Sequence, residues 1–269
     1  MLKQRVITGL LGGAVYLAAT WYGGIPFALL VAVLTVVGYS ELVRMKGLPR
    51  LSLPAVYGYL LTLFLLLGST FVVTKSSWVT SDQVLIPFLL FALFGFLAIS
   101  VISKNKYTYQ DISFLFAGAL YVGLPFHAAL LLRVDPQRGL AYFLFVQVAI
   151  WATDTFAYFV GRAIKGPKVW PAISPNKTIS GTVGGIVGAM VVGAVFAQVM
   201  DLAWGPWILL AAVLSVVGQL GDFVESGLKR SFDVKDSGTL LPGHGGVLDR
   251  FDSILFAAPV AYYAILWLM

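Results

Sequence analysis

The polar segment 222–252 carries the residue types best suited to chemistry. It holds six of the chain's twelve acids, four of its eighteen lysines and arginines, and one of its two histidines. Asp222 and Glu225 begin it and Asp249 and Asp252 end it, each pair spaced to share one helix face. Converging carboxylates repel one another unless a cation lies between them, and hard oxygen ligands suit Mg²⁺. The spacing therefore predicts a Mg²⁺ site with room for a second cation. The alternative is that Asp249 and Asp252 only stabilise a helix N-terminus.

Between these acids lie groups that could bind phosphate. Lys229, Arg230 and Lys235 supply positive charge, and the glycines around His244 let the backbone approach a ligand closely. His244 could donate a hydrogen bond to a phosphate or act as an acid. Each feature also has a plainer interpretation. The basic residues could simply mark the cytoplasmic side of the membrane or contact lipid headgroups. The glycines could form a tight turn, and the histidine could be a structural hydrogen-bond partner.

A second polar segment runs from Gly161 to Gly185. Its lysines and arginine alternate with Gly, Pro and Ser, which places backbone and hydroxyl donors among cations, as a triphosphate requires. Ser180 and Gly181 then open the next apolar segment, whose N-terminal amides could hold an anion.

Asp154 lies about two turns inside an apolar segment, where a carboxylate costs roughly 2.5–3.5 kcal/mol to insert. It is a functional candidate, with a satisfied interhelical hydrogen bond as the alternative. The spacing of Gly181, Gly184, Gly185 and Gly188 instead predicts close packing between helices.

The elements that must position these residues are membrane-spanning helices. The chain is 59% hydrophobic and 11% charged, with a mean hydropathy of +0.90, which excludes an ordinary soluble core. We expect an all-α, polytopic membrane protein, because a helix satisfies its own backbone polar groups in lipid and about 20 apolar residues cross the bilayer. About nine spans are predicted, near residues 6–22, 25–43, 53–73, 83–102, 112–132, 140–160, 181–200, 206–221 and 253–269, the eighth continuing as a helix beyond the membrane. They divide into N-terminal helices (1–140) and C-terminal helices with cytoplasmic loops (141–269), as one integral-membrane unit.

The distribution of basic residues predicts the orientation. With the N-terminus inside and the C-terminus outside, fifteen of the eighteen lysines and arginines are cytoplasmic, and only Lys75, Arg133 and Arg138 are not. Both polar segments then face the cytoplasm. This topology, together with attraction to anionic headgroups, accounts for the net charge of +6 without nucleic acid as a partner. The absence of cysteine excludes disulfides and thiolate chemistry.

These residues, in this order, resemble the phosphatidate cytidylyltransferase (CDP-diacylglycerol synthase) family. The resemblance covers the C-terminal half specifically and the first 140 residues only as a hydrophobic pattern. Ser180 stands where the family commonly has an acid. The matching elements are Ser226-x-x-Lys229-Arg230, Lys235-Asp236, Pro242-x-His244-Gly245-Gly246-x-x-Asp249-Arg250-x-Asp252, Asp154, Ala157-Tyr158-Phe159, Gly161-Arg162 and Ser174-Pro175-x-Lys177-Thr178.

The resemblance implies a Mg²⁺-dependent reaction of CTP with phosphatidate that gives CDP-diacylglycerol and pyrophosphate at the inner face of a bacterial-type cell membrane. The lipid phosphate is itself anionic, so no protein nucleophile is needed, and catalysis is positioning and charge neutralisation. The partners implied are CTP, phosphatidate and membrane lipid, with a homodimer left open. The roles that follow are metal binding by Asp222, Asp249 and Asp252; catalysis by Asp222, Lys229, Arg230, Lys235, Asp236 and His244; and substrate binding by Asp154, Arg162, Ser174, Lys177 and Thr178.

Three other functions remain as alternatives. A CTP-dependent polyprenol kinase would need the same cations and metal but would move the γ-phosphate. A CDP-alcohol phosphotransferase is disfavoured because no Asp-Gly-x-x-Ala-Arg element is present. An ion-coupled transporter would explain Asp154 and the glycine-rich helices, but it would not need a loop dense in phosphate-binding groups, and no two related halves are found.

Overall fold

The computed structural model describes residues 2–68, 81–135, 137–239 and 245–268. This part of the chain is all-α: it has no β-strand, and an isolated pair of bridged residues, Lys168 and Thr178, lies in a loop. The helices are α1 (Leu2–Tyr22), α2 (Gly24–Met45), α3 (Leu53–Leu63) with the π-helical turn η1 (Phe64–Gly68), α5 (Ser81–Ile102), α6 (Tyr109–Val134), α7 (Gly139–Ile164), α8 (Ile179–Val199), α9 (Trp204–Ser231) and α10 (Leu248–Leu268).

Seven segments of the described chain are long and apolar enough to cross a membrane, and they lie in α2 and in α5 to α10. The predicted all-α, polytopic membrane fold is therefore confirmed, and the predicted count of about nine is approximate. The span predicted at 53–73 is represented by a shorter apolar helix, Leu53–Leu67, and its end lies outside the described residues. Helix α9 does continue past the predicted span, to Ser231. Helix α10 begins at Leu248, before the predicted apolar span, so Asp249 and Asp252 belong to its first turns, as their spacing predicts.

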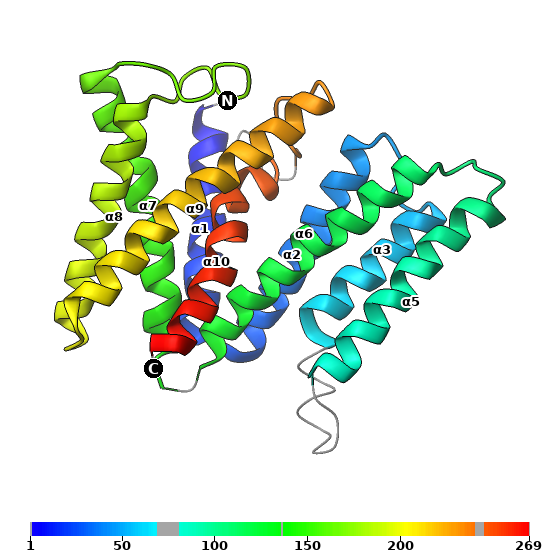
Figure 1. Ribbon diagram of the computed structural model, residues 1–269, viewed down its shortest axis with the longest axis horizontal. Helices are drawn as coiled ribbons and strands as arrows, with labels where there is room; N and C mark the ends of the chain where they lie inside the picture. The colour runs from blue at the N-terminus through cyan, green and yellow to red at the C-terminus, as the bar shows by residue number, and fades with distance from the viewer. Residues whose placement is uncertain (1, 69–80, 136, 240–244, 269) are drawn as a thin grey trace.

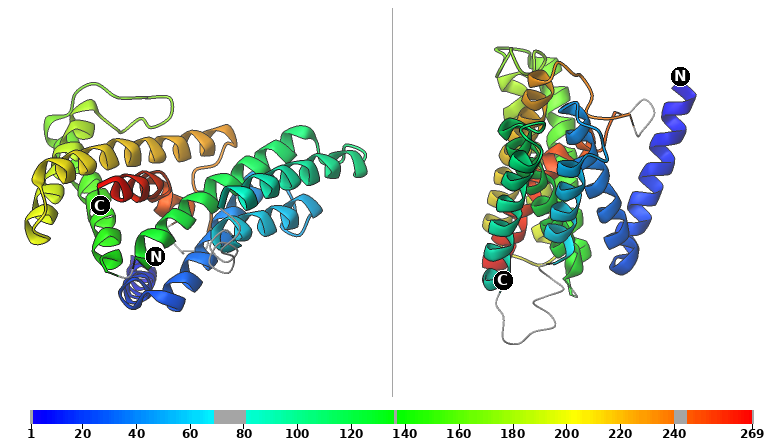
Figure 2. Two further views of the ribbon diagram at one scale, coloured as in Figure 1. Left: turned by 60° about the horizontal axis from the view of Figure 1, so that its bottom comes forward. Right: turned by 90° about the vertical axis from the view of Figure 1, so that its right-hand side faces the viewer.

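The helices run alternately up and down, which separates the loops into two groups (Figure 1). The N-terminus and the loops after α7 and α9 lie at one end of the bundle, and the C-terminus lies at the other. Helices α7, α8 and α9 form one side, α3 and α5 form the other, and α2, α6 and α10 lie between them, as the turned views in Figure 2 also show. Both polar segments named above therefore reach the same end of the molecule.

Glycines set the close approach of α8 to α7. A Cβ on Gly185 would lie 2.9 Å from the carbonyl oxygen of Thr153, and one on Gly181 would lie 2.7 Å from that of Ala157. Gly184 and Gly188 face Val160 and Phe156 in the same way. The predicted packing role of these glycines is confirmed, and it brings the start of α8 against the half of α7 that carries Asp154.

The central helices join the two parts of the chain. Gly38 of α2 faces Leu248 of α10, where an added Cβ would lie 3.3 Å from the leucine Cδ2, and Leu248 is fully buried. Gly221 of α9 lies against the carbonyl of Asp252 in α10. The first turns of α10 are thus enclosed by α2 on one side and α9 on the other. The proposed division at residue 140 into two sets of helices stays a prediction.

Candidate active site

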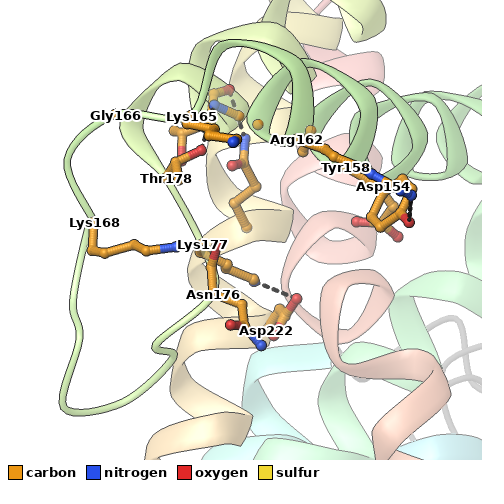
Figure 3. A pocket seen from close by; sticks show the side chains of 15 residues that line it. Asp154, Tyr158, Arg162, Lys165, Gly166, Lys168, Asn176, Lys177, Thr178 and Asp222 are labelled. Carbon is orange, nitrogen blue, oxygen red and sulfur yellow. Dashed lines mark hydrogen bonds and ion pairs between the residues drawn. The ribbon is translucent and has the colours of Figure 1, made fainter.

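A cavity of about 800 Å³ opens between α7, α8, α9 and the loop 165–178 (Figure 3). It combines basic groups from the loop with carboxylates from the helices. Its lining comprises Asp154, Ala157, Tyr158, Gly161, Arg162, Lys165, Gly166, Lys168, Asn176, Lys177, Thr178, Gly181, Thr182, Gln219 and Asp222. A volume of this size is typical of a site for a small organic ligand.

The loop that forms one wall is folded back on itself as a short hairpin. Its two sides are bridged at Lys168 and Thr178, and the backbone N–H of Val169 donates to the carbonyl of Lys177 at 3.1 Å. Thr178 also caps α8, because its hydroxyl accepts a hydrogen bond from the N–H of Gly181 at 3.1 Å. Ser180 donates to the carbonyl of Lys165, which ties the beginning of the loop to its end. The hairpin is therefore held in a defined place at the mouth of the cavity.

Lys177 joins this loop to α9. Its ammonium group forms an ion pair with Asp222 and lies 4.4 Å from the ring centre of Phe223. Trp170, on the other side of the loop, packs edge-to-face on the same ring with centroids 4.7 Å apart. Asp222 also accepts a weak hydrogen bond of 3.4 Å from Ser226. The cation of the loop and the first acid of α9 thus meet at the wall of the cavity, as Figure 3 shows.

Three carboxylates from three helices lie near this ion pair. Asp154 of α7 and Asp222 of α9 line the cavity. Asp252 of α10 is close enough to both for the negative charges to repel, and Lys177 attracts it. One ammonium group therefore lies among three acidic side chains.

A second group of charges lies further along α9. Glu225 and Lys229 follow Asp222 at spacings of three and seven residues, so the three side chains form one stripe along the helix. Lys229 contacts Glu225 at 2.6 Å and Asp249 of α10 at 2.7 Å. We refer to Glu225, Lys229 and Asp249 as the ion-pair cluster. Its lysine and aspartate side chains are only 14% and 8% exposed, so water screens their attraction weakly.

The other oxygen of Asp249 is also occupied. It accepts hydrogen bonds from the backbone N–H and the hydroxyl of Ser237, both at 2.9 Å, and from the N–H of Gly246 at 2.7 Å. Gly245 has a φ of 79°, and a Cβ there would lie 3.1 Å from the carboxyl carbon of Asp249. Asp249 therefore organises the chain between α9 and α10, with little capacity left for another partner.

The predicted site residues divide into three sets. The cavity brings together Asp154, Arg162, Lys177, Thr178 and Asp222, whereas Ser174 does not line it. Arg230, Lys235 and Asp236 lie exposed at and beyond the end of α9, and His244 lies outside the described residues.

Within the described chain, no three His, Asp or Glu side chains form a group spaced to hold a metal ion. The predicted grouping of Asp222, Asp249 and Asp252 is thus not seen as a metal cluster; Asp249 is directed to Lys229 instead.

The sequence interpretation missed several residues. Tyr158, Asn176 and Gln219 line the cavity without having been assigned a role. Lys165 and Lys168 also line it, although they were considered only as part of the basic loop and not as individual site residues. It also missed Glu41, a carboxylate of α2 that is 4% exposed and accepts three hydrogen bonds from the chain around Ser237 and Leu248. A signal for Glu41 was available: it is an acid inside an apolar helix, which marks a functional candidate by default.

Similarity to known proteins agrees with this geometry. Residues 3–268 match the Cytidylyltransferase family. The chain is 43% identical to a phosphatidate cytidylyltransferase of Bacillus subtilis, across 97% of both proteins. It is 37% identical to a phosphatidate cytidylyltransferase of Staphylococcus haemolyticus and 36% identical to one of Staphylococcus aureus, each across 96% of this chain and 97% of the relative. The match extends over the N-terminal helices as well as the polar loops, and the chain belongs to the Cytidylyltransferase family.

Proposed function

We propose that this protein transfers the cytidylyl group of CTP to phosphatidate, giving CDP-diacylglycerol and pyrophosphate. The observation that carries the proposal is the ion pair between Lys177 and Asp222 at the wall of the cavity. It joins a loop rich in basic residues to an acid of α9, close to Asp252 of α10. Substrates that are anionic, one soluble and one lipid, would meet at such a place.

The residues of the cavity have the chemistry that CTP requires. Lys165, Lys168 and Lys177 offer ammonium groups to the triphosphate, and Arg162 offers a planar guanidinium. Arg162 is held by a hydrogen bond of 3.0 Å to the hydroxyl of Tyr158, so its position at the rim is defined. The phosphate of phosphatidate is the nucleophile and is already ionised. The protein therefore has to align two anions and neutralise their repulsion rather than abstract a proton.

The acids near Lys177 fit a divalent cation. Mg²⁺ in phosphoryl-transfer sites is held by one or two carboxylates together with substrate phosphates, so a full protein cage is not needed. We propose Asp222 and Asp252 as its ligands. Asp249, the third ligand predicted from the sequence, is not included, because Lys229 and Ser237 occupy its two oxygens. A bound Mg²⁺ would stabilise the negative charge that develops at the α-phosphate. A second cation and a homodimer stay predictions.

The reaction class is tested by following labelled phosphate. Purified protein is supplied with phosphatidate in detergent and with CTP labelled at the α- or the γ-phosphate. We expect the α-label to enter the lipid while pyrophosphate is released, because the cytidylyl group is transferred. Label from the γ-position in the lipid would indicate a lipid kinase instead, and ion flux in vesicles with neither product would indicate a transporter.

We also propose that the end carrying both polar loops faces the cytoplasm, with the N-terminus inside and the C-terminus outside. Fifteen of the eighteen basic residues support this orientation. Since the chain has no cysteine, single cysteines can test it at Thr239 and Gln137, exposed positions in the connections that follow α9 and α6. These two connections lie at opposite ends of the bundle (Figure 1). In sealed cells, an impermeant thiol reagent should label Gln137→Cys alone, and Thr239→Cys should react only after lysis. Labelling of Thr239→Cys in intact cells would reverse the orientation.

A further inference from the structure

The buried carboxylate of Glu41 binds both sides of the connection between α9 and α10. Its Oε2 accepts hydrogen bonds from the Ser237 hydroxyl at 2.8 Å and the Leu248 N–H at 3.0 Å, and its Oε1 accepts one from the Val247 N–H at 2.8 Å. These partners lie about 200 residues away in the chain; the Val247 contact spans 206. A single acid of the N-terminal half therefore fixes the entry and the exit of this connection.

The surroundings of Glu41 are adapted to its carboxylate. The glycines Gly238 and Gly246 both pass so close to it that an added Cβ on either would collide with its oxygens. One turn further along α2, Arg44 donates a hydrogen bond of 3.0 Å to the carbonyl of Ser237. Two charged side chains of α2 thus bind Ser237: Glu41 through its hydroxyl and Arg44 through its backbone carbonyl.

Ser237 connects these α2 side chains to the ion-pair cluster, because it also binds Asp249. Its hydroxyl lies 2.8 Å from Glu41 Oε2 and 2.9 Å from Asp249 Oδ2, and its backbone N–H also binds Asp249. A hydroxyl has one hydrogen, so it donates to one of the two carboxylates at a time, while the backbone N–H of Ser237 donates to Asp249 independently of it. Asp249 in turn holds Lys229 at 2.7 Å. A continuous chain of contacts therefore links Glu41 to Lys229, although Glu41 does not line the cavity.

We propose that Glu41 is a positioning residue for the reaction: from α2 it sets the place of Ser237 and Asp249, and through them the place of Lys229. In this proposal Lys229, which lies two turns along α9 from Asp222 and outside the lining of the cavity, attracts a phosphate of the lipid substrate by its charge. The proposal rests on the cytidylyl transfer proposed above only for its effect on rate. Its structural part, the fixing of the connection by Glu41, is independent of the reaction.

The test compares Glu41→Gln with Thr35→Val. Glutamine keeps the size of the side chain, but in either orientation its NH₂ group faces a backbone N–H, of Val247 or of Leu248. Thr35→Val is the matched control, because it removes a buried hydrogen bond of α2 that goes to Val31 within the same helix. A nitroxide attached to Thr239→Cys, an exposed residue two positions after Ser237, reports the mobility of the connection.

We expect Glu41→Gln to mobilise the nitroxide and to lower kcat roughly 10–100-fold, as loss of a partner outside the direct ligands commonly does. CTP affinity, measured by equilibrium binding, should change by less than about twofold because the cavity lining is untouched. Thr35→Val should leave the nitroxide mobility, kcat and CTP affinity unchanged. Arg44→Gln provides a second variant if Glu41→Gln fails to fold. It should also make the nitroxide more mobile and lower kcat, with little change in CTP affinity.

Two results would overturn the proposal. One is an immobile nitroxide with normal kcat in both Glu41→Gln and Arg44→Gln. The other is a parallel loss of kcat, CTP affinity and thermal stability with an immobile nitroxide, which would make Glu41 a general stabilising residue. If the wild type made no CDP-diacylglycerol, the proposed function would fail, while the nitroxide would still decide whether Glu41 fixes the connection.

Discussion

Asp222→Asn is expected to lower kcat/KM about a thousandfold while the protein stays folded and inserted. Asparagine keeps the shape of the side chain, but it removes one of the negative charges facing the cavity and the partner of Lys177. Loss of a cation at a transferring phosphate costs several kcal/mol of transition-state stabilisation, and each 1.36 kcal/mol is about tenfold in rate. The measurement is initial rate against Mg²⁺ concentration, and half-saturation should move to higher Mg²⁺.

Two further variants accompany Asp222→Asn: one at its ion-pair partner, Lys177, and one at an exposed acid that serves as the control. Lys177→Ala removes one charge-assisted contact worth roughly 1.5–3 kcal/mol, so the KM for CTP should rise roughly 10- to 150-fold with little change in that for phosphatidate. Asp201→Asn, at an exposed turn between α8 and α9, should leave rate and Mg²⁺ dependence unchanged. Normal rates and an unaltered Mg²⁺ dependence in Asp222→Asn would remove Asp222 from the cation site.

The sequence predicts the parts of this structure that depend on local pattern. Apolar length places the spans, and glycine spacing predicts the contact between α7 and α8, because both follow from single helices and their neighbours. The continuation of α9 beyond its predicted span is also a local feature. Asp154 and Asp222 were selected by charge and position and Lys177 by the family resemblance, and the cavity brings the three together.

The parts that could not be predicted depend on which helices pack together. Glu41 and Val247 are 206 residues apart, and nothing in either neighbourhood specifies the other. In the same way, spacing put Asp249 on the face of Asp252 and so suggested a shared metal, whereas its carboxylate is taken by Lys229 and Ser237. A carboxylate can satisfy its charge with a metal, an ammonium group or backbone N–H groups, and the choice depends on three-dimensional neighbours.

Asp249 offers the sharpest test of that distinction. As an anchor of the ion-pair cluster, it holds Lys229 and three donors from the connection between α9 and α10. Asp249→Asn should then lower the thermal stability of the detergent-solubilised protein and reduce turnover about a hundredfold or more. The loss in unfolding free energy should be about 1.5–3 kcal/mol, since Lys229 keeps its contact with Glu225.

The Mg²⁺ dependence of Asp249→Asn separates the two roles. If Asp249 only anchors Lys229, Asp249→Asn should reach half its maximal rate at the same Mg²⁺ concentration as the wild type, because the acids at the cavity are intact. A direct metal ligand would instead shift half-saturation upward, as expected for Asp222→Asn, with little loss of thermal stability. Asp233→Asn is the matched control: Asp233 is exposed in the same connection with a φ of 53°, a conformation that asparagine also tolerates. Its rate, stability and Mg²⁺ dependence should equal those of the wild type, so that any change in Asp249→Asn reflects the contacts of Asp249 rather than the loss of one negative charge.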